Sequence, residues 1–239
     1  MYLGKKVSIV FPVYNEKENI KNAIEEFLGH PAVDEVVAVD NNSKDGSDAE
    51  IKLTSAKYVK ETTQGYGAAL RRGMQEATGD LIVTVEPDGT FRASDLDRLL
   101  VYSQDYDVVF GTRTARHPIW SEGEPGTNMY FALRIGNWAV AKFLEYLFNG
   151  PSLTDVGCTY KLIHRLAYEK VKHTFTVNGS WFSPEYMVRV LQARLPVIEI
   201  PLQYGARIGT SKITGRPWPA IKLGFRMIWF ILVERLKSR

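Results

Sequence analysis

The first half of this chain alternates short runs rich in β-branched residues with amphipathic helical segments. This alternation favours consecutive βαβ units and therefore a mostly parallel sheet. The predicted strands cover residues 7–12, 35–40, 57–61, 81–86 and 107–111, and the predicted helices between them cover 16–28, 67–77 and 94–103. We therefore expect an α/β fold in which helices flank a central sheet, in the manner of the Rossmann-like folds.

The second half of the chain has a different pattern. Residues 114–127 are rich in turn formers and lack periodicity, which predicts a long surface loop with the length typical of a functional lid. An unusually apolar helix is predicted at 128–149, followed by a helix at 184–193, a strand at 197–204 and a basic, apolar helix from about 217. We expect one domain at 1–214 and a separate C-terminal helix at 215–239.

Composition excludes several classes of protein. The chain has 239 residues, 45% of them hydrophobic and 24% charged, as in an ordinary globular protein. A net charge of +3 gives no reason to expect a nucleic-acid partner. One cysteine, Cys158, permits neither an intrachain disulfide nor a thiolate zinc cluster and fits a reducing compartment. The N-terminus is too short and polar before the first strand for a secretory signal, and no apolar run approaches the length of a membrane span.

Polar groups follow four of the predicted strands, in the segments FPVYNE, DNNSKDGS, EPDG and GTR. Ligands of open parallel sheets bind beyond the carboxyl ends of the strands. The charged residues of these segments are therefore expected at one rim; they are Asp40, Asp45, Glu86, Asp88 and Arg113. Each segment alone is also an ordinary polar turn, and the Pro-Asp-Gly of the third is common turn chemistry. Their joint placement favours a binding site.

These segments resemble the family 2 inverting glycosyltransferases of the GT-A fold, as do GYGAALRRGMQEATGD and IEIPLQYGARIGTSKI further along. The most similar branch contains dolichyl-phosphate mannose synthase and related polyprenyl-phosphate sugar synthases. The resemblance runs through residues 6–214. It implies transfer of a hexose from a UDP- or GDP-sugar to a polyprenyl phosphate, with inversion and with Mg²⁺ or Mn²⁺ as cofactor.

The resemblance also implies a nucleotide-sugar site. Pro12, Tyr14 and Glu16 would border the base and ribose, and Asp40 would contact the nucleoside, since carboxylates accept hydrogen bonds from hydroxyl and N–H groups. Gly65 and Gly67 would allow close backbone approach beside a helix that starts with free N–H groups. The full predicted set is Pro12, Tyr14, Glu16, Asp40, Asn42, Gly65, Gly67, Arg71, Glu86, Pro87 and Asp88. The dinucleotide fingerprint G-x-G-x-x-G is absent, because Leu70 occupies the third glycine position.

The family's metal motif is Asp-x-Asp, and this chain has Glu86-Pro87-Asp88 in its place. Glutamate is still a hard oxygen ligand, and Mg²⁺ usually takes one or two carboxylates together with phosphate oxygens. Asp88 occupies the position of the family's main ligand and ranks above Glu86. Thr90 replaces a glutamine found in many relatives. We expect metal dependence, with Glu86 and Asp88 as the metal ligands.

The expected acceptor is a phosphate. Many family members use the aspartate of a Glu-Asp pair as general base, whereas here Tyr186 follows Glu185. A phosphate monoester is already ionised at neutral pH and needs cations to position it rather than a base. Glu185 is then a possible base, an anchor of the site, or the partner of an arginine.

The resemblance divides the remaining predicted residues into two groups. The predicted catalytic residues are Asp88, Arg113, Glu185, Arg207 and Lys212, and the predicted acceptor-phosphate residues are Arg113, Arg116, Arg134 and Asp155. Arg134 lies in the apolar helix, where a solvated surface charge is least expected. Arg207 and Lys212 match the family's R…SK element, which would close over a phosphate, and arginine suits bidentate phosphate contact.

The C-terminal helix is apolar over most of its circumference, with Lys222, Arg226 and Lys237 along one stripe. We expect it to lie on the cytoplasmic face of a membrane, so that the protein is peripheral. Packing on the protein's own core or on a second copy in a homodimer are the alternatives. Many relatives continue into spanning helices after this point, so the resemblance is compatible with a peripheral form or with a shortened chain.

Three other functions remain open on sequence grounds. A family 2 transferase with a hydroxyl acceptor, on a glycan or another lipid, is the first. A non-catalytic nucleotide-sugar-binding protein is the second, because Glu86 and Thr90 depart from the family pattern. A sugar-1-phosphate nucleotidyltransferase is the third. The segment PVYNEKEN argues against it, because such enzymes have a glycine-rich basic loop after the first strand.

Overall fold

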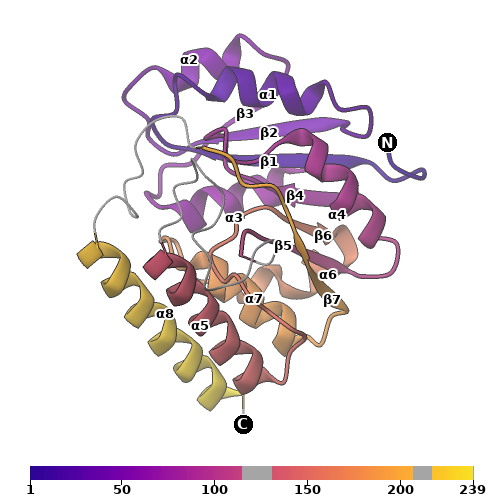
Figure 1. The fold of residues 1–239 in the computed structure, drawn as a ribbon. Helices are drawn as coiled ribbons and strands as arrows, with labels where there is room; N and C mark the ends of the chain where they lie inside the picture. Colours follow the sequence, from indigo (N-terminus) through magenta and orange to yellow (C-terminus); the bar gives the residue numbers. More distant parts are fainter. Residues whose placement is uncertain (115–130, 207–216, 239) are drawn as a thin grey trace.

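A seven-stranded sheet forms the centre of the molecule, whose computed structural model describes residues 1–114, 131–206 and 217–238 (Figure 1). In spatial order the strands are β3 (Lys57–Lys60), β2 (Glu35–Asp40), β1 (Val7–Val13), β4 (Leu81–Thr84), β6 (Lys161–His164), β5 (Val108–Thr112) and β7 (Val197–Pro201). β6 runs antiparallel to β4 and β5, and the other pairings are parallel. The predicted α/β fold with a mostly parallel sheet is confirmed.

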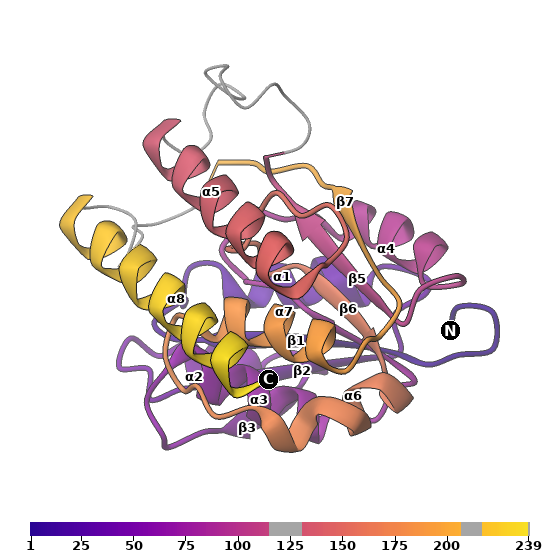
Figure 2. The ribbon, with the colours of Figure 1, turned by 90° about the horizontal axis from the view of Figure 1, so that it is seen from below.

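Helices cover both faces of the sheet (Figures 1 and 2). One face packs against α1 (Ile20–Leu28), α2 (Ser47–Lys52) and α4 (Leu96–Tyr102). The other packs against α3 (Tyr66–Glu76), α5 (Phe131–Phe148), α6 (Arg165–Val171), α7 (Phe182–Gln192) and α8 (Pro217–Lys237). Two short 3₁₀ helices, η1 (Ala93–Asp95) and η2 (Lys172–Thr174), precede α4 and follow α6. Successive strand residues alternate between the two cores, as the pleat requires.

The first helix starts later than its sequence pattern predicts. We expected it from residue 16, but α1 begins at Ile20. The backbone N–H groups of residues 15–17 donate instead to Ser43, Ser47 and Asp45 in the loop after β2. These side chains hold the segment after β1 in a loop, and they link the carboxyl ends of β1 and β2.

Other element boundaries also differ. β7 ends at Pro201 rather than 204, and α7 begins two residues earlier than expected. Four elements were not predicted, namely α2, β6, α6 and the short η2. β6 has no strand-like alternation in the sequence, because it is buried on both faces between β4 and β5 and contains the charged residue Lys161.

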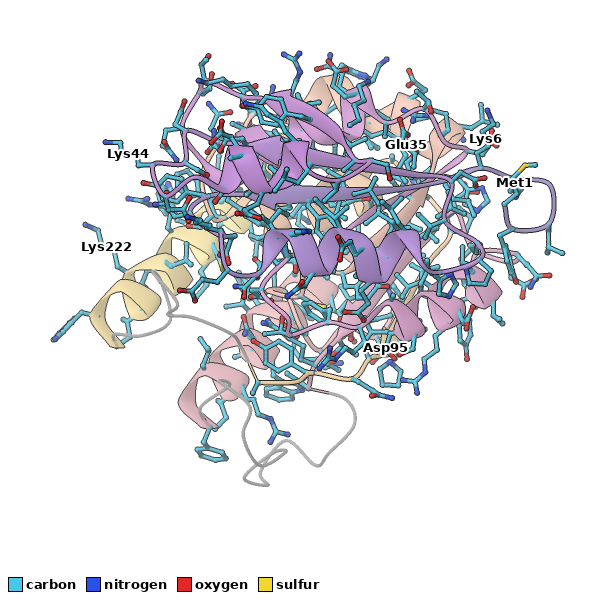
Figure 3. All side chains as sticks on the ribbon, turned by 90° about the horizontal axis from the view of Figure 1, so that it is seen from above. Met1, Lys6, Glu35, Lys44, Asp95 and Lys222 are labelled. Atoms are coloured by element: carbon cyan, nitrogen blue, oxygen red, sulfur yellow. The ribbon has the colours of Figure 1, made fainter. Side chains whose placement is uncertain are left out.

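The parallel strands direct their carboxyl ends to one edge of the molecule. Figure 3 shows Lys44, which follows β2, at this edge, and Met1 and Lys6, which precede β1, at the opposite edge. β1 has β2 on one side and β4 on the other, so the strand order reverses there. A ligand site is expected outside such a reversal.

Helices α5 and α8 lie side by side, and α8 also contacts α7 (Figures 1 and 2). The inward side of α8 contributes Met227 and Ile231 to the core. The inward side of the C-terminal helix therefore packs on the protein's own core, which was one of the alternatives to a membrane surface. No helix among the described residues is long and apolar enough to cross a membrane.

Candidate active site

A cavity of about 440 Å³ lies beyond the carboxyl ends of β1, β4 and β5. Its polar side is lined by predicted residues, namely Pro12, Tyr14, Glu16, Gly65, Glu86, Pro87, Asp88 and Arg113. Its other side contains Leu133 and Asn137 of α5 and Leu223 and Met227 of α8. The cavity therefore joins ionisable groups at the strand ends to an apolar wall formed by two helices.

Glu86 and Asp88 share this cavity but differ in exposure. Asp88 is 1% exposed, and its Oδ1 accepts hydrogen bonds from the Thr90 N–H (3.0 Å) and hydroxyl (2.6 Å). Glu86 is half-buried. Thr90 thus fixes the rotamer of Asp88.

The segment after β7 crosses this turn. The Gly205 N–H donates to the carbonyl of Thr90 at 2.9 Å, and Tyr204 lines the cavity. The structure therefore brings the chain that leads toward Arg207 and Lys212 to the Asp88 turn. Arg207 and Lys212 themselves, like Arg116, lie outside the described residues.

The group contributed by the end of β2 is Asn41, which was not among the residues predicted from the sequence. Asn41 lines the cavity and is fully bonded: its amide donates to the carbonyls of Glu61 and Thr63, and its oxygen accepts from Gln64 and the Gly65 N–H. Asn41 was within the quoted DNNSKDGS segment, but nothing in the sequence distinguished it from its neighbours.

Neither of the predicted residues beside Asn41 is part of the cavity lining. Asp40 is buried and accepts the Ser43 N–H, and it contributes to raising the pKa of Tyr58, after the effect of burial. Asn42 donates to Thr62 and Gln64. The convergence of strand ends is therefore confirmed for β1, β4 and β5, and for β2 through Asn41.

Gly65 and Gly67 allow another part of the backbone to approach closely, and that part is residues 177–178 of this chain rather than a ligand. A Cβ at Gly65 would lie 2.1 Å from the Asn178 carbonyl oxygen, and one at Gly67 would lie 2.4 Å from that of Val177. The N–H groups of Gly67 and Ala68 both donate to the Asn178 carbonyl. The expectation of free N–H groups at this helix start was wrong, because residues 177–178 cap it. Arg71, further along α3, donates to the Asn178 side chain.

Arg113 directly follows β5, and Asp155 holds its side chain in place. Its Nε and Nη2 donate to the two oxygens of Asp155 at 2.7 and 2.9 Å. Its Cζ lies 5.2 Å from the centre of the Tyr204 ring. Burial alone would raise the pKa of Asp155, but the Arg113 guanidinium outweighs burial and the pKa is lowered. The pair contributes directional N–H donors to the cavity rather than a net charge.

Glu185, in the first turn of α7, is fully buried away from the cavity lining. It accepts hydrogen bonds from the Thr176 N–H and hydroxyl and from the Val177 N–H, and Arg189 is 3.6 Å away. Of the three roles considered for Glu185, this geometry matches two, the anchor and the partner of an arginine. It secures the segment that caps α3 and that supplies Gly179 and Ser180 to the cavity.

Several further residues of the site were not predicted. They are Gln64, Tyr66, Asn137, Gly157, Thr159, Ser180, Ser183 and Tyr204. Beneath them Lys161 is 2% exposed and donates to Ser183 Oγ at 2.8 Å; burial lowers its pKa. Most of the lining residues come from loops, where no sequence periodicity marks an inward position, and the others come from α3, α5 and α7.

Arg134 is 3% exposed, as its apolar surroundings in the sequence predicted. It belongs to α5, the helix that also supplies Leu133 and Asn137 to the cavity. Cys158 is likewise buried, as expected.

The donor set for a metal is limited to hard oxygens. No cluster of three or more His, Cys, Asp or Glu side chains occurs among the described residues. Glu86 and Asp88 line one cavity as a pair of carboxylates. Two carboxylates fit Mg²⁺ or Mn²⁺ that completes its coordination with phosphate oxygens and water, and they do not fit a structural zinc site.

A carboxylate-bearing cavity at the switch point of such a sheet, bounded by two helices, is the arrangement of a GT-A glycosyltransferase. The chain matches the family model for glycosyl transferase family 2 over residues 8–172 and belongs to that family. The predicted family and the predicted enzyme class, a nucleotide-sugar-dependent glycosyltransferase, are thereby confirmed.

Sequence relatives agree with this assignment. An uncharacterised glycosyltransferase of Mycobacterium tuberculosis is 26% identical over 221 residues, which cover 89% of this chain and 91% of the relative. An undecaprenyl-phosphate 4-deoxy-4-formamido-L-arabinose transferase of Sodalis glossinidius is 29% identical, and the match covers 87% of this chain and 62% of the relative.

A solved structure supports the fold. Glucosyl-3-phosphoglycerate synthase of Mycobacterium tuberculosis, in complex with Mn²⁺, UDP and glucosyl-3-phosphoglycerate, superposes with a TM-score of 0.71 at 17% identity. The superposition covers 97% of this chain and 80% of the synthase. The same synthase has also been solved with Mg²⁺ and UDP. The GT-A prediction is confirmed, and the predicted cofactors are the ions that this synthase binds.

Proposed function

We propose that this protein transfers a hexose from a UDP- or GDP-sugar to a polyprenyl phosphate, with inversion at the anomeric carbon. The observation that carries the proposal is the two-sided cavity. Carboxylates and Arg113 occupy one side, where a charged donor and an acceptor phosphate would be bound, and Leu133, Leu223 and Met227 occupy the other. An acceptor that combines a phosphate with a hydrocarbon chain matches both sides.

The donor side follows from the strand ends. Pro12, Tyr14 and Glu16 would contact the nucleoside. Gln64 and Gly65, in the loop between β3 and α3, also line the cavity. Asn41 supports this wall by holding the Gly65 backbone. Glu86 and Asp88 would hold Mg²⁺ or Mn²⁺, which would place positive charge against the leaving diphosphate.

The reaction needs no general base if the acceptor is a phosphate monoester. Its second pKa is about 6, so an oxygen is already ionised at neutral pH. That oxygen attacks the anomeric carbon, the bond from this carbon to the donor diphosphate breaks, and the nucleoside diphosphate leaves with the electron pair. Glu185 is bonded to residues 176–177 and is not part of the described cavity lining, which is consistent with a transfer that dispenses with a carboxylate base at that position.

The acceptor phosphate would be positioned by Arg113, Arg134, Arg116, Arg207 and Lys212. Arg113 is already oriented by Asp155, and Arg134 is buried on a helix that borders the cavity. Arginine side chains that are fixed before binding lose little entropy when the phosphate arrives.

A lipid acceptor requires access to a membrane surface, and α8 offers a suitable face. Its outward side exposes Trp218 (79%), Phe225 (69%) and Trp229 (70%), with Ile221 and Leu236 on the same stripe. Lys222 and Arg226 flank this stripe, and Figure 3 shows Lys222 projecting away from the body of the protein. Aromatic residues with basic neighbours favour the interface of an anionic bilayer. We therefore propose a peripheral location on the cytoplasmic face.

One experiment separates this proposal from its alternatives. Purified protein is incubated with Mn²⁺, a panel of UDP- and GDP-sugars, and either a polyprenyl phosphate or the matching polyprenol. We expect product with the phosphate and none with the alcohol. Transfer to the alcohol or to a sugar hydroxyl alone would establish a hydroxyl-acceptor transferase, and donor binding without transfer to any acceptor would establish a non-catalytic protein.

A further inference from the structure

A carboxylate outside the cavity controls the position of Arg113. Glu199 of β7 accepts hydrogen bonds from the Thr154 N–H (2.7 Å), the Thr154 hydroxyl (2.7 Å) and the Asp155 N–H (3.1 Å). Asp155 in turn accepts both side-chain hydrogen bonds of Arg113 and the Arg113 backbone N–H. We propose that Glu199 is a positioning residue of this transferase, which fixes residues 154–155 and thereby orients the Arg113 guanidinium in the cavity.

Three threonine hydroxyls extend this control to the backbone on both sides of Arg113. Thr112 Oγ1 lies 2.8 Å from Thr154 Oγ1, and the Thr114 N–H and hydroxyl bond to Thr112 Oγ1 and the Thr154 carbonyl. A hydroxyl has one hydrogen to donate. Because Thr154 donates its hydrogen to Glu199, Thr112 must donate to Thr154. The Glu199 carboxylate therefore determines which hydroxyl is the donor in the hydrogen bonds that hold residues 112–114.

The surroundings of Glu199 make this arrangement sensitive to its charge. Burial, with the nearby Asp155 carboxylate, raises the pKa of Glu199 to about 7. The charged groups near it are Asp155 and the buried Lys161, with Arg113 on the far side of Asp155, and on the α5 side Lys142 and Glu145 hydrogen-bond to the adjoining residues 152–153. A proton on Glu199 occupies an oxygen that receives an N–H or O–H donor. The hydrogen bonds from residues 154–155 to Glu199 are therefore strongest when Glu199 is ionised.

The test compares Glu199→Gln with Glu145→Gln. Glu145 is a matched control, because it accepts the Leu153 N–H at 3.0 Å and so holds the same segment without touching residues 154–155. The first readout is independent of catalysis: the Arg113 Nε–H resonance in ¹⁵N-arginine-labelled protein. We expect slow exchange of this proton in the wild type and in Glu145→Gln, and fast exchange or a lost signal in Glu199→Gln.

The second readout rests on the proposed function and uses transfer to polyprenyl phosphate. We expect Glu199→Gln to raise the acceptor KM about tenfold with the donor KM unchanged. The rise in kcat/KM as pH increases through about 7 should vanish in Glu199→Gln, while the acceptor's own ionisation near pH 6 remains. In an Arg113→Lys background, Glu199→Gln should add less than a twofold loss, because residues acting as one unit are not additive.

Three results would overturn the positioning role. They are an unchanged Arg113 signal in Glu199→Gln, an equal loss of that signal in Glu145→Gln, and losses of activity that multiply independently in the Arg113→Lys, Glu199→Gln double variant. If the wild-type protein proves inactive toward polyprenyl phosphate, the proposed acceptor fails, and the Arg113 resonance still decides the role of Glu199.

Discussion

At the scale of single residues, Asp88 and Glu86 share a cavity but not an environment. Asp88 is buried and its rotamer is fixed by two hydrogen bonds from Thr90, whereas Glu86 is half-buried. The Asp88 carboxylate is therefore held in one orientation before any cation binds. Glutamate therefore stands at the more exposed of the two carboxylate positions.

This difference predicts unequal losses. Asp88→Asn should lower kcat/KM for transfer about 100-fold and weaken the Mn²⁺ dependence, and Glu86→Gln should cost about tenfold. Asp97→Asn is the control, because its side chain is 72% exposed on α4, where it contacts His30. Transfer rates over a Mn²⁺ titration provide the measurement. Equal activity of Asp88→Asn and the wild type would remove the metal role from this turn.

Cys158 predicts an unreactive thiol. Burial raises its pKa to about 12, and the thiolate is the reactive form. Native protein treated with iodoacetamide at pH 8 should remain unmodified by mass spectrometry, and denatured protein should gain one adduct. Rapid labelling of the native protein would show that β6 and its preceding turn open readily.

At the scale of elements, the sequence predicted the parallel half of the sheet well and the antiparallel strand not at all. β1, β2 and β4 are continuous apolar runs bounded by turn formers, which identify buried parallel strands. β6 contains a lysine and owes its place to pairing with β4 and β5, which is a long-range property. The same holds for Asn178, whose carbonyl caps α3 from a distant loop.

The α3 cap predicts a specific sensitivity to size. Gly67→Ala should lower the free energy of unfolding by about 1–3 kcal/mol, since its Cβ would overlap the Val177 carbonyl oxygen. Gly224→Ala in α8 is the control, because no atom lies within 4 Å of its Cβ and alanine favours a helix by about 1 kcal/mol. Urea unfolding of both variants gives the comparison. A Gly67→Ala protein as stable as the wild type would show that residues 177–178 do not pack closely against α3.

The outward face of α8 predicts binding to anionic membranes. Replacing Trp218, Phe225 and Trp229 by glutamine should abolish sedimentation with vesicles containing phosphatidylglycerol, while transfer to a short-chain, water-soluble polyprenyl phosphate continues. Leu166→Gln is the control, since Leu166 is 78% exposed on α6, away from α8. Undiminished vesicle binding by the triple variant would contradict the assignment. A concentration-dependent dimer that the triple substitution dissociates would show that the stripe binds a second copy of the chain instead.

At the scale of the whole molecule, one helix connects the two surfaces that the proposal requires. The inward face of α8 supplies Leu223 and Met227 to the cavity, and its outward face exposes the aromatic stripe. Arg226 lies over the Trp181 ring at 4.7 Å, beside the segment that supplies Gly179 and Ser180 to the cavity. The cavity therefore lies next to the surface that would meet the membrane, so a lipid-borne phosphate would have a short path to the donor.

A lipid phosphate as acceptor is tested most directly by comparing two acceptors that differ only in that group. Wild-type protein with Mn²⁺ and its preferred nucleotide sugar is given equal amounts of a polyprenyl phosphate and the corresponding polyprenol. We expect a glycosylated polyprenyl phosphate, inverted at the anomeric carbon, and no glycosylated polyprenol. Transfer to the polyprenol at an equal or greater rate, or retention of the anomeric configuration, would contradict it.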